Sequence, residues 1–203
     1  MFKDKQNNNQ KGFTLMEVLV VLAIFSVFMV LAIDLILTIN RVQRETRVSE
    51  RVLSESRFIL NTIASEVRGG TIDYEAYGDP ADPEDAIINP ADELIVVNQN
   101  AERVRIKGDI NFCPSAESTP CLLISRDDGI SWASMTPIGV RLLEIKFIIN
   151  PDRDPFYFNG IDYLAENQPM VTTILRLENT EELGVDEFVL HNQTTISERA
   201  YGR

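Results

Sequence analysis

The feature that most constrains this chain is a long apolar run near its N-terminus that contains a single acidic residue. From Phe13 to Ile33 the sequence is uncharged except for Glu17, and the next acid is Asp34. The sixteen residues between the two acids would form about 24 Å of helix, which is shorter than a hydrocarbon core of ~30 Å. With the flanking residues 13–16 and 35–39 included, the run becomes long enough to span a membrane.

Glu17 is the residue of this run that most needs a physical explanation. A carboxylate at the centre of a membrane helix costs about 2.5 kcal/mol or more, and the penalty is smaller near the end of a span. An ionisable residue in this position is therefore a functional candidate by default. The alternative is that its side chain reaches the headgroups and has no further role. Asp34 is interpreted as an interfacial residue at the opposite boundary.

Residues 1–12 form a short polar segment before the apolar run. They contain three lysines and one aspartate and have no apolar stretch of their own, unlike a secretory signal peptide. An alternative is cleavage by ordinary signal peptidase after Val30-Leu31-Ala32, which would release a secreted protein that starts at Ile33. The acid inside the apolar run argues against this alternative.

A periodic apolar stripe indicates that the helix continues beyond the apolar run. Five apolar residues recur at spacings of four and seven, which is typical of one helical face, and Gly69-Gly70 is a common kind of helix end. We predict one continuous helix from about Thr14 to Arg68, apolar nearly all round in its first half and amphipathic in its second. The stripe consists of Val48, Val52, Ile59, Ile63 and Val67.

Residues 71–93 differ in composition, since they hold eight acids and three prolines. We predict that they form the loop between the helix and a sheet. Asp79, Asp82 and Asp85 offer the oxygen ligands that calcium prefers, but their spacing matches no calcium-binding loop. A solvated acidic loop is the favoured interpretation.

Alternating and apolar runs predict antiparallel strands in the remainder of the chain. In the clearest of them Leu143, Ile145 and Phe147 would share one face, and Asp-Asp-Gly at 127–129 is a hairpin signal. One long helix, a loop and then antiparallel strands predict an α+β fold whose sheet covers the stripe of the helix. Trp132 is expected to pack in the core or at its rim. The predicted strands span residues 94–97, 104–107, 122–126, 130–133, 141–149, 172–177 and 187–197.

Cys113 and Cys121 are the two cysteines of the chain. Outside the cytoplasm a disulfide between them is expected, and free thiols are the alternative. Two cysteines cannot complete a structural zinc site.

The composition argues against catalysis and against nucleic-acid binding. Acids outnumber Lys and Arg by 31 to 19, for a net charge of −12, and phosphate binding needs clustered basic residues. The chain has one histidine, His191 on a predicted strand, and the sequence offers no convincing Ser-His-Asp or Cys-His set. Asp152 and Asp154 are interpreted as parts of a turn, not of a metal site. We therefore expect no enzyme, no cofactor and no metal.

The sequence Lys-Gly-Phe-Thr-Leu-Met-Glu at residues 11–17, followed by the apolar run, resembles the N-terminus of prepilin-like proteins. These are the type IV pilins and the pseudopilins of type II secretion systems. The resemblance implies that a prepilin peptidase cuts between Gly12 and Phe13 and methylates the new N-terminus. It also implies that Glu17 meets the Phe13 amine of a neighbouring subunit, an attractive pair in a medium of low dielectric constant.

The resemblance further implies a domain layout and a location. Residues 1–12 would be a cleaved cytoplasmic leader, residues 13–40 a helix that spans the inner membrane and later forms the filament core, and residues 41–203 a pilin-like periplasmic or extracellular domain. The implied partners are prepilin peptidase, other pilin-like subunits and an inner-membrane assembly platform.

Within this family the chain departs from the common pattern of a helix broken by glycine and proline, because Ser26 and Asp34 occupy those positions. This departure favours a minor subunit, similar to the J-type minor pseudopilins around the sequence Ile-Lys-Phe-Ile-Ile, that primes or caps a filament. Two alternatives stay open: a type IV minor pilin for adhesion or DNA uptake, and a membrane-anchored periplasmic binding domain that never polymerises.

Overall fold

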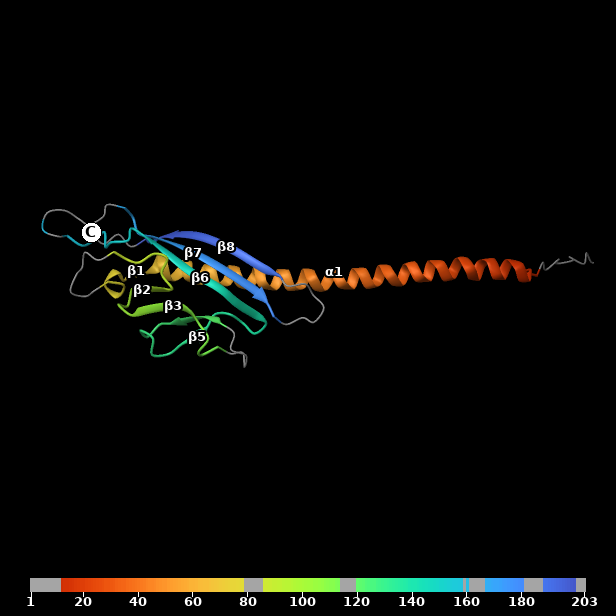
Figure 1. Ribbon diagram of the computed structural model, residues 1–203, viewed down its shortest axis with the longest axis horizontal. Helices are drawn as coiled ribbons and strands as arrows, with labels where there is room; N and C mark the ends of the chain where they lie inside the picture. Colours follow the sequence, from red (N-terminus) through yellow and green to blue (C-terminus); the bar gives the residue numbers. More distant parts are fainter. Residues whose placement is uncertain are drawn as a thin grey trace, which may run out of the picture. The chain divides into compact units, whose positions relative to one another are not determined.

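The structure is a computed structural model that describes residues 12–78, 86–113, 120–158, 160, 167–180 and 188–199. The chain divides into two compact units, residues 1–44 and 45–203. One helix contributes residues to both units, and the described strands belong to the second (Figure 1). The elements are helix α1 (Leu15–Gly69), β1 (Thr71–Ile72), the 3-10 helix η1 (Tyr74–Ala76), β2 (Glu93–Val97), β3 (Arg103–Asp109), β4 (Cys121–Ser125), β5 (Ala133–Ser134), β6 (Val140–Asn150), β7 (Met170–Asn179) and β8 (Val189–Ser197).

Helix α1 confirms the prediction of one continuous helix. All five residues of the predicted stripe are at most 7% exposed. Ser56 and Ala64 also belong to the buried face, although the apolar pattern did not include them. A buried hydroxyl needs a hydrogen-bond partner, and Ser56 Oγ accepts one from Asn192 Nδ2 at 3.1 Å.

The end of α1 is followed by a glycine that close packing requires. A Cβ atom on Gly70 would lie 2.5 Å from the carbonyl oxygen of Val97 and 2.6 Å from Cγ1 of Val96. Any larger residue would therefore separate the end of the helix from β2. The predicted Gly69-Gly70 ending is confirmed, and the close contacts at Gly70 give it a steric reason.

The described strands form two antiparallel sheets, β1-β2-β3-β4-β5 and β6-β7-β8. This confirms the α+β prediction, with two sheets in place of the single sheet that was expected. The predicted hairpin of 94–97 and 104–107 is present as β2 and β3, with Leu94 opposite Ile106. Fully buried side chains from α1, from the first sheet and from the second join in one apolar cluster, among them Ile59, Ile63 and Phe147.

Strand β6 has the predicted position but a different facing pattern. A β-bulge between Leu142 and Glu144 interrupts its pairing with β7. As a result Leu142 is 3% exposed and Leu143 is 39% exposed, so the prediction that Leu143 shares the buried face of Ile145 and Phe147 is wrong. One extra residue in a strand of period two moves the following side chains to the opposite face.

The second predicted hairpin is shorter than expected, because β5 spans two residues where the sequence predicted 130–133. The carboxylate of Asp127 accepts hydrogen bonds from Ser125 Oγ at 2.7 Å and from the Ser131 N–H at 2.8 Å. Such side-chain bonds compete with strand pairing. The turn residues therefore do not join the pairing of β4 with β5, and Ile130 is 86% exposed.

The predicted loop between α1 and β2 is wrong at both ends. Residues Thr71–Ile72 pair with β2 as the short strand β1. Nearer β2, Ala91 and Phe147 exchange two backbone hydrogen bonds, at 2.7 and 2.9 Å. The Asn89 side chain donates to and accepts from the backbone of Ile149, each at 2.9 Å. These contacts cover the outer edge of β6 near its C-terminal end.

A disulfide joins Cys113 and Cys121, with their Cα atoms 5.8 Å apart. Cys113 lies in the segment that follows β3, and Cys121 is the first residue of β4. In the sheet Cys121 pairs with Asp109, the last residue of β3. The structure thus contains the disulfide expected from the sequence.

Glu198, which follows β8, is a buried carboxylate without a hydrogen-bond partner among the described residues. It is 2% exposed. The pKa of Glu198 is raised to about 7, chiefly because the carboxyl group is buried. The backbone N–H of Ile72 lowers this pKa in part, although it does not reach hydrogen-bond geometry, and the charge of Asp154 raises it. Since the folded-state pKa lies above the ordinary value, ionisation destabilises the folded state as the pH rises toward 7, and the full cost applies above that pH.

We predict that replacing both cysteines by alanine lowers the free energy of unfolding by about 2–3 kcal/mol, because the open loop gains entropy in the unfolded chain. Chemical denaturation of the full-length protein in detergent measures this loss. Reductant should produce the same loss in the wild type and leave the double variant unchanged. A double variant that unfolds like the oxidised wild type would contradict the prediction.

We predict that Glu198→Gln raises the free energy of unfolding at pH 8 and has little effect at pH 4, where the glutamate is already protonated. The expected gain is of order 1–3 kcal/mol, measured by denaturation at both pH values. Glu178→Gln is the control, since this buried acid is ion-paired with Arg141 and its loss should destabilise the protein at pH 8. An equal effect of Glu198→Gln at both pH values would exclude the ionisation mechanism.

Candidate functional site

The N-terminal end of α1 is organised by Thr14. The backbone N–H of Glu17 donates to Thr14 Oγ1 at 3.3 Å and to the Thr14 carbonyl oxygen at 3.1 Å, and the N–H of Val18 donates to the same carbonyl at 3.2 Å. Thr14 is therefore the N-cap residue, which satisfies donors that the first helical turn would otherwise leave unpaired. In an apolar surrounding these unpaired donors would be costly.

The cap places Glu17 at the third position of the helix, as the acidic residue of its first turn. Thr14 and Glu17 have the Ser/Thr-x-x-Glu spacing of a capping box. A negative charge in the first turn is also favourable toward the positive end of the helix dipole. The sequence reasoning missed the role of Thr14, although this spacing was the signal that identifies it.

Gly12 and Phe13 precede the helix and are open to their surroundings. The Phe13 side chain is 82% exposed. A Cβ atom on Gly12 would meet no atom within 4 Å, so packing within this chain does not demand a glycine there.

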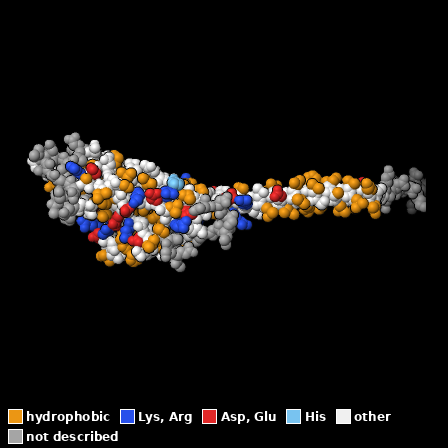
Figure 2. All heavy atoms as spheres, viewed as in Figure 1, with side chains coloured by type: hydrophobic (Ala, Val, Ile, Leu, Met, Phe, Trp, Pro, Cys, Tyr) orange, Lys and Arg blue, Asp and Glu red, His pale blue; other side chains and the backbone are white. Residues whose placement is uncertain are grey.

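Figure 2 shows apolar side chains along the visible face of the part of α1 in the first unit, and each large apolar side chain there is at least 45% exposed. Its hydroxyls are bonded within the helix, because Ser26 Oγ donates to the Ala23 carbonyl at 2.8 Å and Thr38 Oγ1 to the Asp34 carbonyl at 2.9 Å. Among the described residues α1 is the one helix long and apolar enough to cross a membrane. No break occurs at Ser26 or Asp34, as predicted.

The other residues singled out from the sequence lie elsewhere in the structure. Asp154 Oδ1 accepts the Phe156 N–H at 2.8 Å, which confirms the predicted turn. His191 is exposed on β8. Trp132 is half-buried at the rim, and its ring centroid lies 4.8 Å from Lys107 Nζ. The calcium candidates Asp79, Asp82 and Asp85 lie outside the described residues. Within the described ranges no three His, Cys, Asp or Glu side chains come together as a metal site.

Comparison with known proteins finds one similarity, at this N-terminal end. Residues 7–33 match the family described as the prokaryotic N-terminal methylation motif. No curated protein and no solved structure matches the chain. The matched range contains Gly12, Phe13, the Thr14 cap and Glu17, together with the apolar run up to Ile33. The chain thus carries the methylation motif that is characteristic of prepilin-like proteins such as type IV pilins and pseudopilins.

Proposed function

We propose that this chain is a minor pilin-like subunit, a pseudopilin, that acts in the assembly or priming of a type II secretion pseudopilus or a type IV pilus. The observation that carries the proposal is the methylation motif at residues 7–33, set on a continuous apolar helix with Glu17 in its first turn. Prepilin peptidase cuts between Gly12 and Phe13 and methylates the amine of Phe13. Residues 13–40 anchor the subunit in the inner membrane, and residues 41–203 form the periplasmic or extracellular domain.

The Thr14 cap supports this assignment of roles. Cleavage leaves Phe13 as the residue directly before the cap, so the new amine is attached to a helix end whose geometry is already defined. Within a bundle of apolar helices a lone Glu17 carboxylate or a lone amine would each be costly. Pairing the carboxylate of one subunit with the amine of its neighbour removes both penalties and selects one axial register. Glu17 therefore acts in the specificity of packing more than in stability.

The assembly machinery follows from this role. The partners are prepilin peptidase, an inner-membrane assembly platform and other pilin-like subunits that contact the apolar helix. A type IV minor pilin that binds DNA is less well supported, because the net charge of −12 repels phosphate. A membrane-anchored binding domain that never polymerises has no use for an acid at Glu17.

We predict that the mature protein starts at a methylated Phe13 only in cells that contain prepilin peptidase. Intact mass spectrometry of the membrane-extracted protein, from strains with and without the peptidase, measures this directly. Gly12→Leu should leave the precursor uncut in both strains. A chain that starts at Ile33, or an uncut wild-type precursor in both strains, would overturn the proposed processing.

We predict that Glu17→Ala and Glu17→Gln reduce the amount of subunit in sheared filaments at least tenfold without preventing cleavage at Gly12. The physical reason is that each variant leaves the partner amine unpaired in an apolar environment. Asp34→Asn is the matched control, since it removes another acid from the same helix. Equal loss in the Asp34 variant would show a general effect of helix charge, and normal incorporation of both Glu17 variants would favour the non-polymerising anchor.

A further inference from the structure

Strand β8 has an open edge. It is the outer strand of the sheet β6-β7-β8, and it pairs with β7 along its whole length without a register shift. The nine residues of β8 include no proline, Lys, Arg, Asp or Glu, which are the residues that usually protect an edge strand from further pairing. Among the described residues its backbone forms hydrogen bonds with β7 alone.

The other outer strands of the two sheets are closed or very short. Strands β1 and β5, at the two sides of the first sheet, have two residues each. Asn89 and Ala91 bond to the outer side of β6 near its C-terminal end, and near its start the N–H of Leu142 donates to the Pro120 carbonyl oxygen at 3.2 Å. Strand β8 is therefore the long edge in the described part of the chain that can accept another strand.

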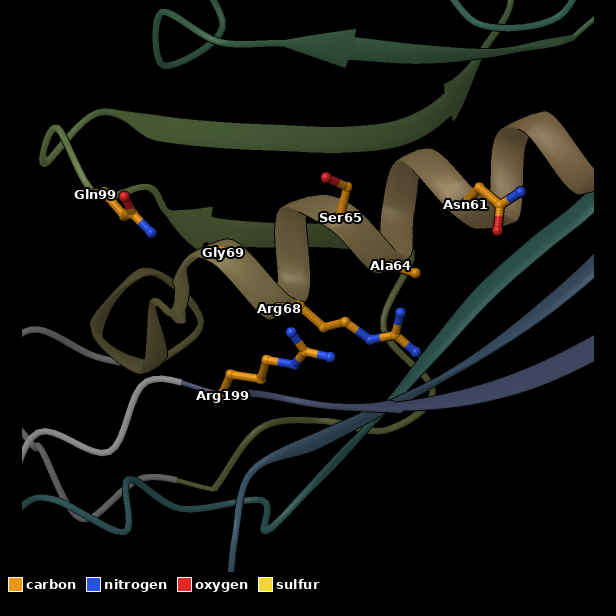
Figure 3. A pocket seen from close by; sticks show the side chains of 7 residues that line it. All are labelled: Asn61, Ala64, Ser65, Arg68, Gly69, Gln99 and Arg199. Atoms are coloured by element: carbon orange, nitrogen blue, oxygen red, sulfur yellow. The ribbon is translucent and has the colours of Figure 1, made fainter.

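A hollow of about 650 Å³ lies where the chain leaves β8 (Figure 3). The last turns of α1 form its floor, Arg199 comes from the segment that follows β8, and Gln99 comes from the turn between β2 and β3. Arg199 is two residues beyond Ser197, the last residue of β8. The hollow therefore lies close to the C-terminal end of β8. Its lining residues are Asn61, Ala64, Ser65, Arg68, Gly69, Gln99 and Arg199.

The hollow is cationic in a chain that is strongly acidic. Figure 3 shows the side chains of Arg68 and Arg199 directed into the same space from two different elements. None of the lining residues is an acid, and neither guanidinium has an ion-pair partner among the described residues. By contrast, five other arginines are paired with carboxylates: Arg103, Arg105, Arg126, Arg141 and Arg176.

The helix dipole explains the position of Arg68 but not that of Arg199. Arg68 is in the last turn of α1, where a cation is favourable toward the negative end of the helix dipole. Arg199 lies on a different element and has no such role. Two guanidiniums that converge without a local acid form the kind of group that recognises a carboxylate.

We propose that the open edge of β8 and the Arg68–Arg199 hollow form one binding site for an extended segment of another protein that carries a carboxylate. The segment adds as a fourth strand beside β8, so that main-chain hydrogen bonds supply affinity and the two arginines select the charge and the register. Because Arg199 lies two residues past the strand, the carboxylate must extend about 7 Å beyond the paired residues. The site is formed within residues 45–203 and does not depend on filament assembly.

The test uses the full-length protein in detergent and eight-residue labelled peptides, with binding read by fluorescence anisotropy. One peptide has six alternating Thr and Val residues followed by two Asp residues, and a second has the two Asp residues first, so that both strand directions are covered. Both peptides are blocked at their ends, and each has a counterpart with Asn in place of Asp. We expect at least one Asp peptide to bind about three- to tenfold more tightly than its Asn counterpart, with a difference that shrinks as salt is added.

Protein variants and backbone-blocked peptides separate the two parts of the site. The double variant Arg68→Gln/Arg199→Gln should abolish the preference for Asp. Arg57→Gln, which changes another exposed arginine of α1 outside the hollow, should retain it. For strand addition, two isomers of the better peptide, N-methylated at odd or at even residues, should differ, because only one set of N–H groups faces β8.

Three results would overturn the proposal. The first is equal binding of the Asp and Asn peptides, or no binding of either up to millimolar concentration. The second is a preference for Asp that survives in the double variant. The third is equal binding of the two N-methylated isomers. Because the readout is peptide binding, none of these results bears on cleavage at Gly12 or on the role of Glu17.

Discussion

Burial of one helical stripe is the interaction on which the folded domain depends. Val52, Ile59 and Ile63 of α1 are at most 1% exposed, and the same apolar cluster takes side chains from both sheets. Each of these side chains contributes roughly 1.5–3 kcal/mol by its removal from water. Because the two sheets meet through this cluster, the helix organises strands that are not adjacent in sequence. Gly70 then lets the chain turn from the helix onto β2 without a steric clash.

The same helix has a different physical task in the first unit. There the side chains are apolar all round, and the polar groups are confined to positions where the helix itself satisfies them, such as Ser26 and Thr38. Glu17 and Asp34 are the acids of this apolar part, and Glu17 lies in the first turn of the helix. Thr14 fixes the backbone at this point. In the proposed function the exposed apolar surface and the acid are both completed by neighbouring subunits.

The outer strands of the two sheets differ in whether another strand can pair with them. Two outer strands are very short, and the outer side of β6 is occupied by Asn89 and Ala91. Strand β8 is long, regular and without charged residues, and the chain leaves it beside Arg68 and Arg199. An edge of this kind is an aggregation hazard unless it has a partner, which is the physical basis of the proposed binding site.

Much of this architecture was predictable, because helical periodicity and the methylation motif are local in sequence. The extent of α1, its stripe, its glycine ending, the α+β class and the Cys113–Cys121 pair were all expected. Three features were not expected: the bulge at Leu142–Glu144, the hydrogen bonds of the Asp127 carboxylate in the turn, and the pairing of Ala91 with Phe147. The bulge and the Ala91–Phe147 pair depend on strands that are distant in sequence. The Asp127 turn is local, but it depends on side-chain hydrogen bonds that compete with strand pairing and that apolar alternation does not reveal.

The sequence by itself determined the methylation motif, since the order of Gly12, Phe13, Thr14 and Glu17 is a covalent property of the chain. It also determined which face of α1 is buried, because a period of 3.6 residues places apolar side chains together on any helix. Only the tertiary structure decided that Arg68 and Arg199, 131 positions apart, share one hollow beside an open strand. The reason is that their proximity comes from the packing of α1 between two sheets, and no pattern within either segment encodes that distance.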